Sequence, residues 1–247
     1  MYSYQQRPAV VRRAPLESLS FLRRVYLLFT GGVWFAVAGA LLALYAGAPV
    51  ELAGRTGATV TVPPVIAFGL QHWVVMFIAY IGAFFAATFM RRIRGLNVIA
   101  LFGYAFVTGL FVAPTVFFAQ VMAGAGHTLD ASPVRDAFLL TAAAFVGLSG
   151  YTLVTRKDFS NIGAGLTIGL FVLIGASILG IFVHAAAFQL AIASVGVLLF
   201  AGFILYDTSR IMRSGEDDAV GAALSLFLDI VNMFLFLLRI LSSSRDR

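Results

Sequence analysis

The stretch AVGAALSLFLDIVNMFLFLL, residues 219–238, decides how the rest of the chain has to be arranged. It is long enough to cross a membrane, since about 20 residues span the hydrocarbon core of a bilayer. However, it carries Asp229 about halfway along. A charged side chain at that depth costs about 2.5 kcal/mol or more, so we expect it to face protein rather than lipid. A second acid, Asp207, closes the preceding apolar run, and the two acids are the first candidates for a functional site.

The composition identifies the solvent. Of 247 residues, 61% are hydrophobic and only 11% are charged, which is more apolar surface than a soluble domain of this size can bury. The chain is therefore predicted to be a polytopic membrane protein. It has no cysteine, which excludes disulfides, thiolate nucleophiles and cysteine-ligated metal centres.

Seven runs are long enough to cross a bilayer, and their continuous Leu-, Ala- and Phe-rich character favours helices over barrel strands. The fifth and sixth form one uncharged stretch that has to turn near 184–189, because a single helix of that length would span about two bilayers. We predict an all-α fold with a basic arm at 1–24, a seven-helix transmembrane domain at 25–241 and a polar tail at 242–247. The predicted spans are Val25–Ala48, Val65–Met90, Leu96–Met122, Ala137–Thr155, Ile162–Val183, Ala185–Tyr206 and Ala219–Leu238.

Basic residues gather on one side of the predicted topology. If the amino terminus is cytoplasmic, the opposite loops carry only Arg55 and Arg135, which is a strong positive-inside signal. It also accounts for the net charge of +6 without nucleic acid as a partner. The twelve residues on the amino-terminal side are Arg7, Arg12, Arg13, Arg23, Arg24, Arg91, Arg92, Arg94, Arg156, Lys157, Arg210 and Arg213.

The side of the carboxyl end stays open at this stage. Seven full crossings place residues 242–247 outside, whereas Arg239, Arg245 and Arg247 favour the inside. A full seventh crossing is the preferred interpretation, and a re-entrant segment is the alternative.

One face of the seventh span is polar. Ser225, Asp229, Asn232 and Phe236 are spaced by four, three and four residues, so they share one side of a helix. We therefore expect the seventh helix to lie in the centre of the bundle, ringed by the other six. The structural alternative is that Asp229 only hydrogen-bonds a neighbouring helix, and that Asp207 is an ordinary acid at a helix end.

Two acids on adjacent spans can act as a unit. In a low dielectric two neighbouring carboxylates cannot both ionise cheaply, so the pair is expected to share a proton and to sense pH. The pair also offers hard oxygen ligands, although calcium takes about 6–8 of them, so carbonyls or water would have to complete a site. A nearby arginine could compete for the pair, and Arg91 lies closest to its apolar span.

The chain resembles the Bax inhibitor 1 family, also called the transmembrane Bax inhibitor motif family, from about Phe21 onwards. The resemblance rests on ALSLFLDIVN (223–232) followed by LLRIL (237–241), with support from LYD (205–207), TRKDF (155–159) and GLFVAP (109–114). It implies a seven-helix fold with the last helix central and, as in bacterial members, a pH-sensitive calcium leak. It further implies that Asp207 and Asp229 form a di-aspartyl sensor and that Arg91 latches Asp207. The alternative for Arg91 is a plain positive-inside anchor.

Two protease resemblances are weaker. Tyr206-Asp207 with Asp229 is similar to presenilin-like proteases, but the glycines that precede the second acid in that family are missing. Gly147-Leu148-Ser149-Gly150 fits a rhomboid motif, yet His184 is expected at the opposite end of the bundle, and small-residue helix packing explains the tetrapeptide better. We expect no enzyme activity.

The sequence thus predicts a multi-pass protein of a bacterial cytoplasmic (inner) membrane, with lipid, protons and calcium as partners and no cofactor other than calcium as the permeant or bound ion. Protonation of the Asp207–Asp229 pair would gate the leak. The alternative is a non-conducting regulator of a membrane partner, because one branch of the family is known for interacting with a membrane-bound AAA protease.

Overall fold

The computed structural model describes residues 15–53, 59–122, 132–183, 185–213 and 218–243. Within them, seven helices are long and apolar enough to cross a membrane, which confirms the all-α polytopic prediction. The elements are α1 (Pro15–Tyr45), β1 (Val50–Ala53), β2 (Thr59–Val62), α2 (Pro64–Gln71), α3 (Trp73–Met90), α4 (Leu96–Met122), α5 (Pro133–Thr155), the 3₁₀ turn η1 (Ser160–Ile162), α6 (Gly163–Phe182), α7 (Ala186–Arg213) and α8 (Ala219–Ser243).

Most of the predicted span boundaries agree with these helices, and α4 agrees at both ends. The break between the fifth and sixth spans lies at 183–185, where the turn was expected, although His184 itself is outside the described residues. The second span differs, because His72 leaves helical geometry (φ −119°, ψ 43°) and divides it into the short α2 and the 18-residue α3. The antiparallel hairpin of β1 and β2 was not predicted.

Two helices extend beyond their predicted ends. The amino-terminal helix α1 begins at Pro15, inside the segment expected to be an arm. The prediction that the sixth span ends at Tyr206 was wrong, because α7 continues for about two turns to Arg213. Asp207 therefore lies within a helix rather than at its end. The apolar pattern stops at Tyr206, but Thr208 and Ser209 are fully buried, so the helix is held by packing rather than by hydrophobic sequence.

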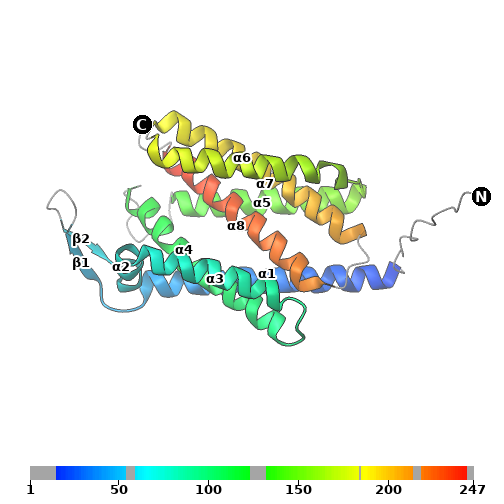
Figure 1. Ribbon diagram of the computed structural model, residues 1–247, viewed down its shortest axis with the longest axis horizontal. Helices are drawn as coiled ribbons and strands as arrows, with labels where there is room; N and C mark the ends of the chain where they lie inside the picture. The colour runs from blue at the N-terminus through cyan, green and yellow to red at the C-terminus, as the bar shows by residue number, and fades with distance from the viewer. Residues whose placement is uncertain (1–14, 54–58, 123–131, 184, 214–217, 244–247) are drawn as a thin grey trace, which may run out of the picture.

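Helix α8 runs through the middle of the bundle. In Figure 1 it crosses diagonally between a group formed by α1, α3 and α4 and a group formed by α5, α6 and α7. Among its described residues only Arg239 is exposed, whereas α3 and α6 expose much of their length. The prediction of a central last helix is confirmed. Because α8 is one continuous helix of 25 residues, it is long enough for a full crossing rather than a re-entrant loop.

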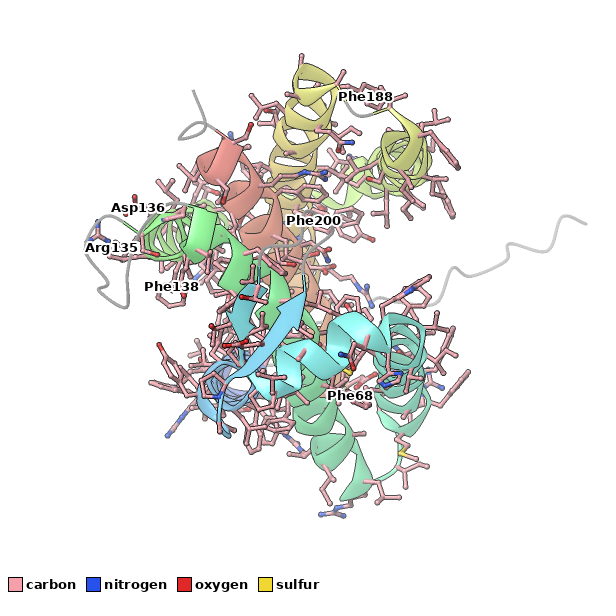
Figure 2. The ribbon with its side chains drawn as sticks, turned by 90° about the vertical axis from the view of Figure 1, so that its left-hand side faces the viewer. Phe68, Arg135, Asp136, Phe138, Phe188 and Phe200 are labelled. Carbon is pink, nitrogen blue, oxygen red and sulfur yellow. The ribbon has the colours of Figure 1, made fainter. Side chains whose placement is uncertain are left out.

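The two ends of the bundle differ in charge. We call the end with the α3–α4, α5–α6 and α7–α8 connections the arginine end, and the end with β1 and β2 the hairpin end (Figure 1). At the hairpin end Arg135 and Asp136 pair at 3.1 Å at the start of α5, as Figure 2 shows. The charge-side prediction also rests partly on Arg7, Arg12, Arg13, Arg55, Arg245 and Arg247, which lie outside the described residues.

Helices α1 and α4 approach each other at two glycines. A β-carbon at Gly109 would lie 2.0 Å from the carbonyl oxygen of Ala36, and one at Gly39 would lie 2.2 Å from that of Phe106. Small residues let helix backbones come this close in a membrane, where tight packing takes the place of the hydrophobic effect. The α1–α4 pair is therefore a rigid part of the bundle.

We predict that Gly109→Ala destabilises the protein by about 1–3 kcal/mol, because the added methyl group would push the α1 backbone away. Gly103→Ala is the matched control in the same helix, since a β-carbon there would have no neighbour within 4 Å. The control should be neutral or more stable by up to about 1 kcal/mol, given the higher helix propensity of alanine. Thermal unfolding in detergent measures both, and equal stabilities would contradict the close α1–α4 contact.

Candidate functional site

The structure brings Asp207 and Asp229 together. The two residues come from the adjacent helices α7 and α8, and they are only 8% and 5% exposed. The Asp229 carboxyl group is in hydrogen-bonding and electrostatic contact with that of Asp207. The acid pair predicted from the sequence is thus a direct contact between two buried side chains.

The pair lies well below the arginine end. At a rise of about 1.5 Å per residue, Asp229 is about 15 Å from the start of α8 and Asp207 about 9 Å from the end of α7. The Oδ2 atom of Asp229 is buried, and no described residue forms a hydrogen bond with it. That oxygen is free to accept a proton or a cation without breaking an existing hydrogen bond.

The polar face of α8 is turned mainly toward α7. Beyond the acid contact, the Phe236 ring stacks on Phe200 of α7 with centroids 6.0 Å apart. Asn232 donates through Nδ2 to the carbonyl oxygen of Leu228 at 2.8 Å, so its amide is used within its own helix. Ser225, one turn before Asp229, lines a cavity instead. Ser225 and Asn232 therefore flank the pair along α8.

Arg91 forms its ion pair with a different acid from the one expected. Its Nε atom lies 3.5 Å from Oδ2 of Asp218, which stands directly before α8. Both side chains are partly exposed, at 39% and 25%. A latch between Arg91 and Asp207 therefore stays a prediction for a different arrangement of the helices.

A cavity of about 650 Å³ opens at the arginine end, and Ser225 is the residue of its lining that comes nearest to Asp229 along α8. Five arginines line it together with a single carboxylate, that of Asp218. The lining residues are Arg24, Arg91, Arg92, Arg94, Asn97, Arg210, Asp218, Ala219, Val220, Gly221, Ala222 and Ser225.

The α5–α6 connection docks on α7 just beyond the pair. The Ser209 hydroxyl accepts from the backbone N–H of Phe159 at 3.1 Å and donates to the carbonyl oxygen of Lys157 at 3.3 Å. On the same helix, Thr208 Oγ1 lies 3.3 Å from Ser149 Oγ. The residues that follow Asp207 thus join α7 to α5 and to its following loop.

The described residues contain no cluster of three or more histidine or acidic side chains that could hold a metal ion. Two aspartates alone supply too few oxygens for a resident calcium ion, which takes about 6–8. Calcium at this pair therefore fits a transient ligand better than a structural one, and its binding stays a prediction.

Comparison with known proteins agrees with this arrangement. The family model described as "Inhibitor of apoptosis-promoting Bax1" matches residues 19–246, which is nearly the whole chain. The chain belongs to the Bax inhibitor 1 family. Similar relatives include mouse protein lifeguard 4, with 35% identity over 91% of this chain and 85% of the relative. An uncharacterised protein of Campylobacter jejuni has 33% identity over 92% and 90%. The Golgi anti-apoptotic protein of vaccinia virus (strain Lister) has 40% identity over 68% and 67%.

These relatives give this Bax inhibitor 1 family protein anti-apoptotic homologues and no name that refers to an enzyme. The structure adds that Ser149 is buried against Thr208, which suits helix packing, while His184 lies outside the described residues.

Sequence reasoning missed Asp218 and the arginine-lined cavity of this Bax inhibitor 1 family protein. Asp218 is an N-terminal cap, because its Oδ1 accepts from the backbone N–H of Gly221 at 2.7 Å. An acid directly before a helix is a recognised start signal, so this role was readable from the sequence. The cavity was not, because its arginines come from four separate segments of the chain.

The α5–α6 loop contains an acid whose pKa is shifted outside the membrane span. The backbone N–H of Ser160 donates to Asp158 at 2.9 Å and Arg213 lies 3.4 Å away, so the pKa of Asp158 is held below its usual value. A carboxylate with a depressed folded pKa stabilises the fold above about pH 4, and that stabilisation is lost as the pH falls through the folded pKa.

We therefore predict that Asp158→Ala lowers the thermal stability at pH 7 and that its difference from wild type disappears in acid. Unfolding in detergent at a series of pH values measures this. A difference that widens on acidification would contradict the assignment. The experiment also identifies the pH range in which the loop, rather than the buried pair, responds.

Proposed function

We propose that this protein is a pH-responsive cation leak in which the Asp207–Asp229 pair senses protons. The observation that carries the proposal is the direct contact of two buried carboxyl groups on adjacent helices of a membrane bundle. Intramembrane acids that face the bundle interior commonly belong to ion or proton pathways. Calcium is the proposed ion, on the strength of the family resemblance.

The pair can couple protonation to helix position. When one proton is shared, the two side chains attract each other and hold α7 against α8. When the pair is fully ionised, the two charges repel, and a cation or an arginine is needed between or beside them. Arg91 on the α3 side is the proposed latch for that second state, after release from Asp218.

We further propose a bacterial cytoplasmic membrane location with the arginine end toward the cytoplasm. The described part of that end carries Arg23, Arg24, Arg91, Arg92, Arg94, Arg156, Lys157, Arg210 and Arg213, and the described part of the hairpin end carries Arg135 and Arg239. This imbalance follows the positive-inside rule.

The competing function is a non-conducting regulator that acts on a membrane partner, such as a membrane-bound AAA protease. The names of the mouse and viral relatives favour it, because they refer to protection from cell death or to no transport at all. In that case the buried pair would tune the conformation that a partner binds.

Calcium flux into liposomes that contain the purified protein separates the two functions. We expect a wild-type leak that depends on pH. Asn cannot titrate, so Asp229→Asn and Asp207→Asn should each flatten that dependence. Asp136→Asn is the matched control, since Asp136 is a partly exposed acid paired with Arg135 at the hairpin end. No flux from folded wild type at any pH would reject the leak and leave the regulatory function.

The coupling also predicts movement of α3 relative to α7. The chain has no cysteine, so spin labels can be placed at Phe89→Cys on α3 and Leu198→Cys on α7, both of which are at least 74% exposed. We expect their distance to change over the pH range in which flux changes. Labels at Trp34 on α1 and Ile99 on α4 are the control, because the α1–α4 pair is rigid. An α3–α7 distance that stays constant would refute the latch mechanism.

A further inference from the structure

The arginine-lined cavity is chemically unlike the acid pair below it. Its lining includes five arginines and one aspartate, which is a formal excess of four positive charges (5 − 1) around a volume of about 650 Å³. The side-chain ion pair that the structure shows inside it, Arg91 with Asp218, accounts for one of these arginines. A gathering of like charges in one hollow is costly unless an anion lies among them.

The arginines converge from different parts of the fold. Arg24 comes from α1, Arg210 from α7, and Arg91, Arg92 and Arg94 from the end of α3 and its loop to α4. Figure 1 shows these segments meeting around the first turns of α8. Because residues distant in sequence surround one space, the cluster is a feature of the folded bundle and more than a run of basic residues at a membrane surface.

The geometry suits oxygen anions. Guanidinium groups are planar forks that bind phosphate oxygens in pairs, and arginine is the usual choice where such recognition is needed. The start of α8 also forms part of the lining, and a helix amino terminus adds partial positive charge and backbone N–H donors. Asp218 already occupies the N–H of Gly221, so the arginines rather than the cap have to supply the main contacts.

We propose that this cavity is a binding site for a phosphate-bearing anion, held by Arg24, Arg92 and Arg94 and limited by the competing carboxylate of Asp218. The phosphate can belong to the headgroup of an anionic phospholipid in the facing leaflet or to a soluble polyphosphate. The site is separate from the acid pair and does not depend on conduction.

Binding can be measured as the concentration-dependent rise in Tm of the full-length protein in a neutral detergent at low ionic strength. One series uses inorganic pyrophosphate. A second uses short-chain phosphatidylglycerol, with phosphatidylcholine of the same chains as its uncharged counterpart. Potassium chloride of matched ionic strength corrects for general screening. We expect pyrophosphate or phosphatidylglycerol, and not phosphatidylcholine or the chloride salt, to raise the Tm.

The triple variant Arg24→Gln, Arg92→Gln, Arg94→Gln should weaken the effective ligand by at least about tenfold, because each charge-assisted contact is strong. The matched control is Arg23→Gln, Arg135→Gln, Lys157→Gln, which removes the same charge from side chains outside the cavity lining. The control should bind like wild type. Equal losses in both variants would overturn the site and indicate non-specific attraction.

Asp218→Asn tests the same site by gain rather than loss. Asparagine still caps a helix, so the start of α8 is retained, while the competing charge beside Arg91 is removed. We expect tighter binding, on the order of three- to tenfold. Stabilisation by phosphatidylglycerol alone identifies a lipid site, and stabilisation by both ligands shows that phosphate suffices. The proposal fails if neither ligand stabilises wild type, or if Asp218→Asn weakens binding.

Discussion

The cost of placing two carboxylic acids at bilayer depth is the constraint on which the rest of this fold depends. Asp207 and Asp229 cannot face lipid, and each can be tolerated only because the other is beside it. That requirement places α8 in the centre, since its acid lies midway along its length and a peripheral helix would expose it. The six other spanning helices then supply the apolar exterior, which explains why α3 and α6 are largely exposed.

The packing around α8 divides the bundle into a stiff part and a part that the pair can move. On one side, α1 and α4 are in backbone contact at Gly39 and Gly109, which leaves no room for sliding. On the other, α7 is joined to α8 through the acid contact itself and the Phe200–Phe236 stack. The titratable contact thus lies at the junction that has fewer fixed backbone contacts, where a change in protonation has most effect on helix position.

The sequence predicted the parts of this fold that depend on solvent and missed the parts that depend on assembly. Helix α4 could be bounded to the residue because charges and loop residues flank its apolar run. The break at His72 could not, since the run from Val65 to Met90 is continuous in hydrophobicity. Asp207 was recognised as a site residue but misplaced at a helix end, because buried Thr208 and Ser209 look like a loop in the sequence. The contact between the two acids required the angle at which α7 meets α8, and no pattern within either span encodes it.

The arginine end presents an electrostatic problem for cation conduction, and the structure indicates how it is met. A cation that approaches Asp229 from this end passes the cavity next to Ser225, where five arginines face one carboxylate. At an effective dielectric constant of about 20, each unlike or like charge about 10 Å away contributes roughly 1.7 kcal/mol, so an excess of four positive charges is a substantial barrier. An anion bound among the arginines lowers that barrier without touching the acid pair. Proton sensing at Asp207–Asp229 and anion binding at the cavity would then act on the same ion in series, one at the mouth and one in the core.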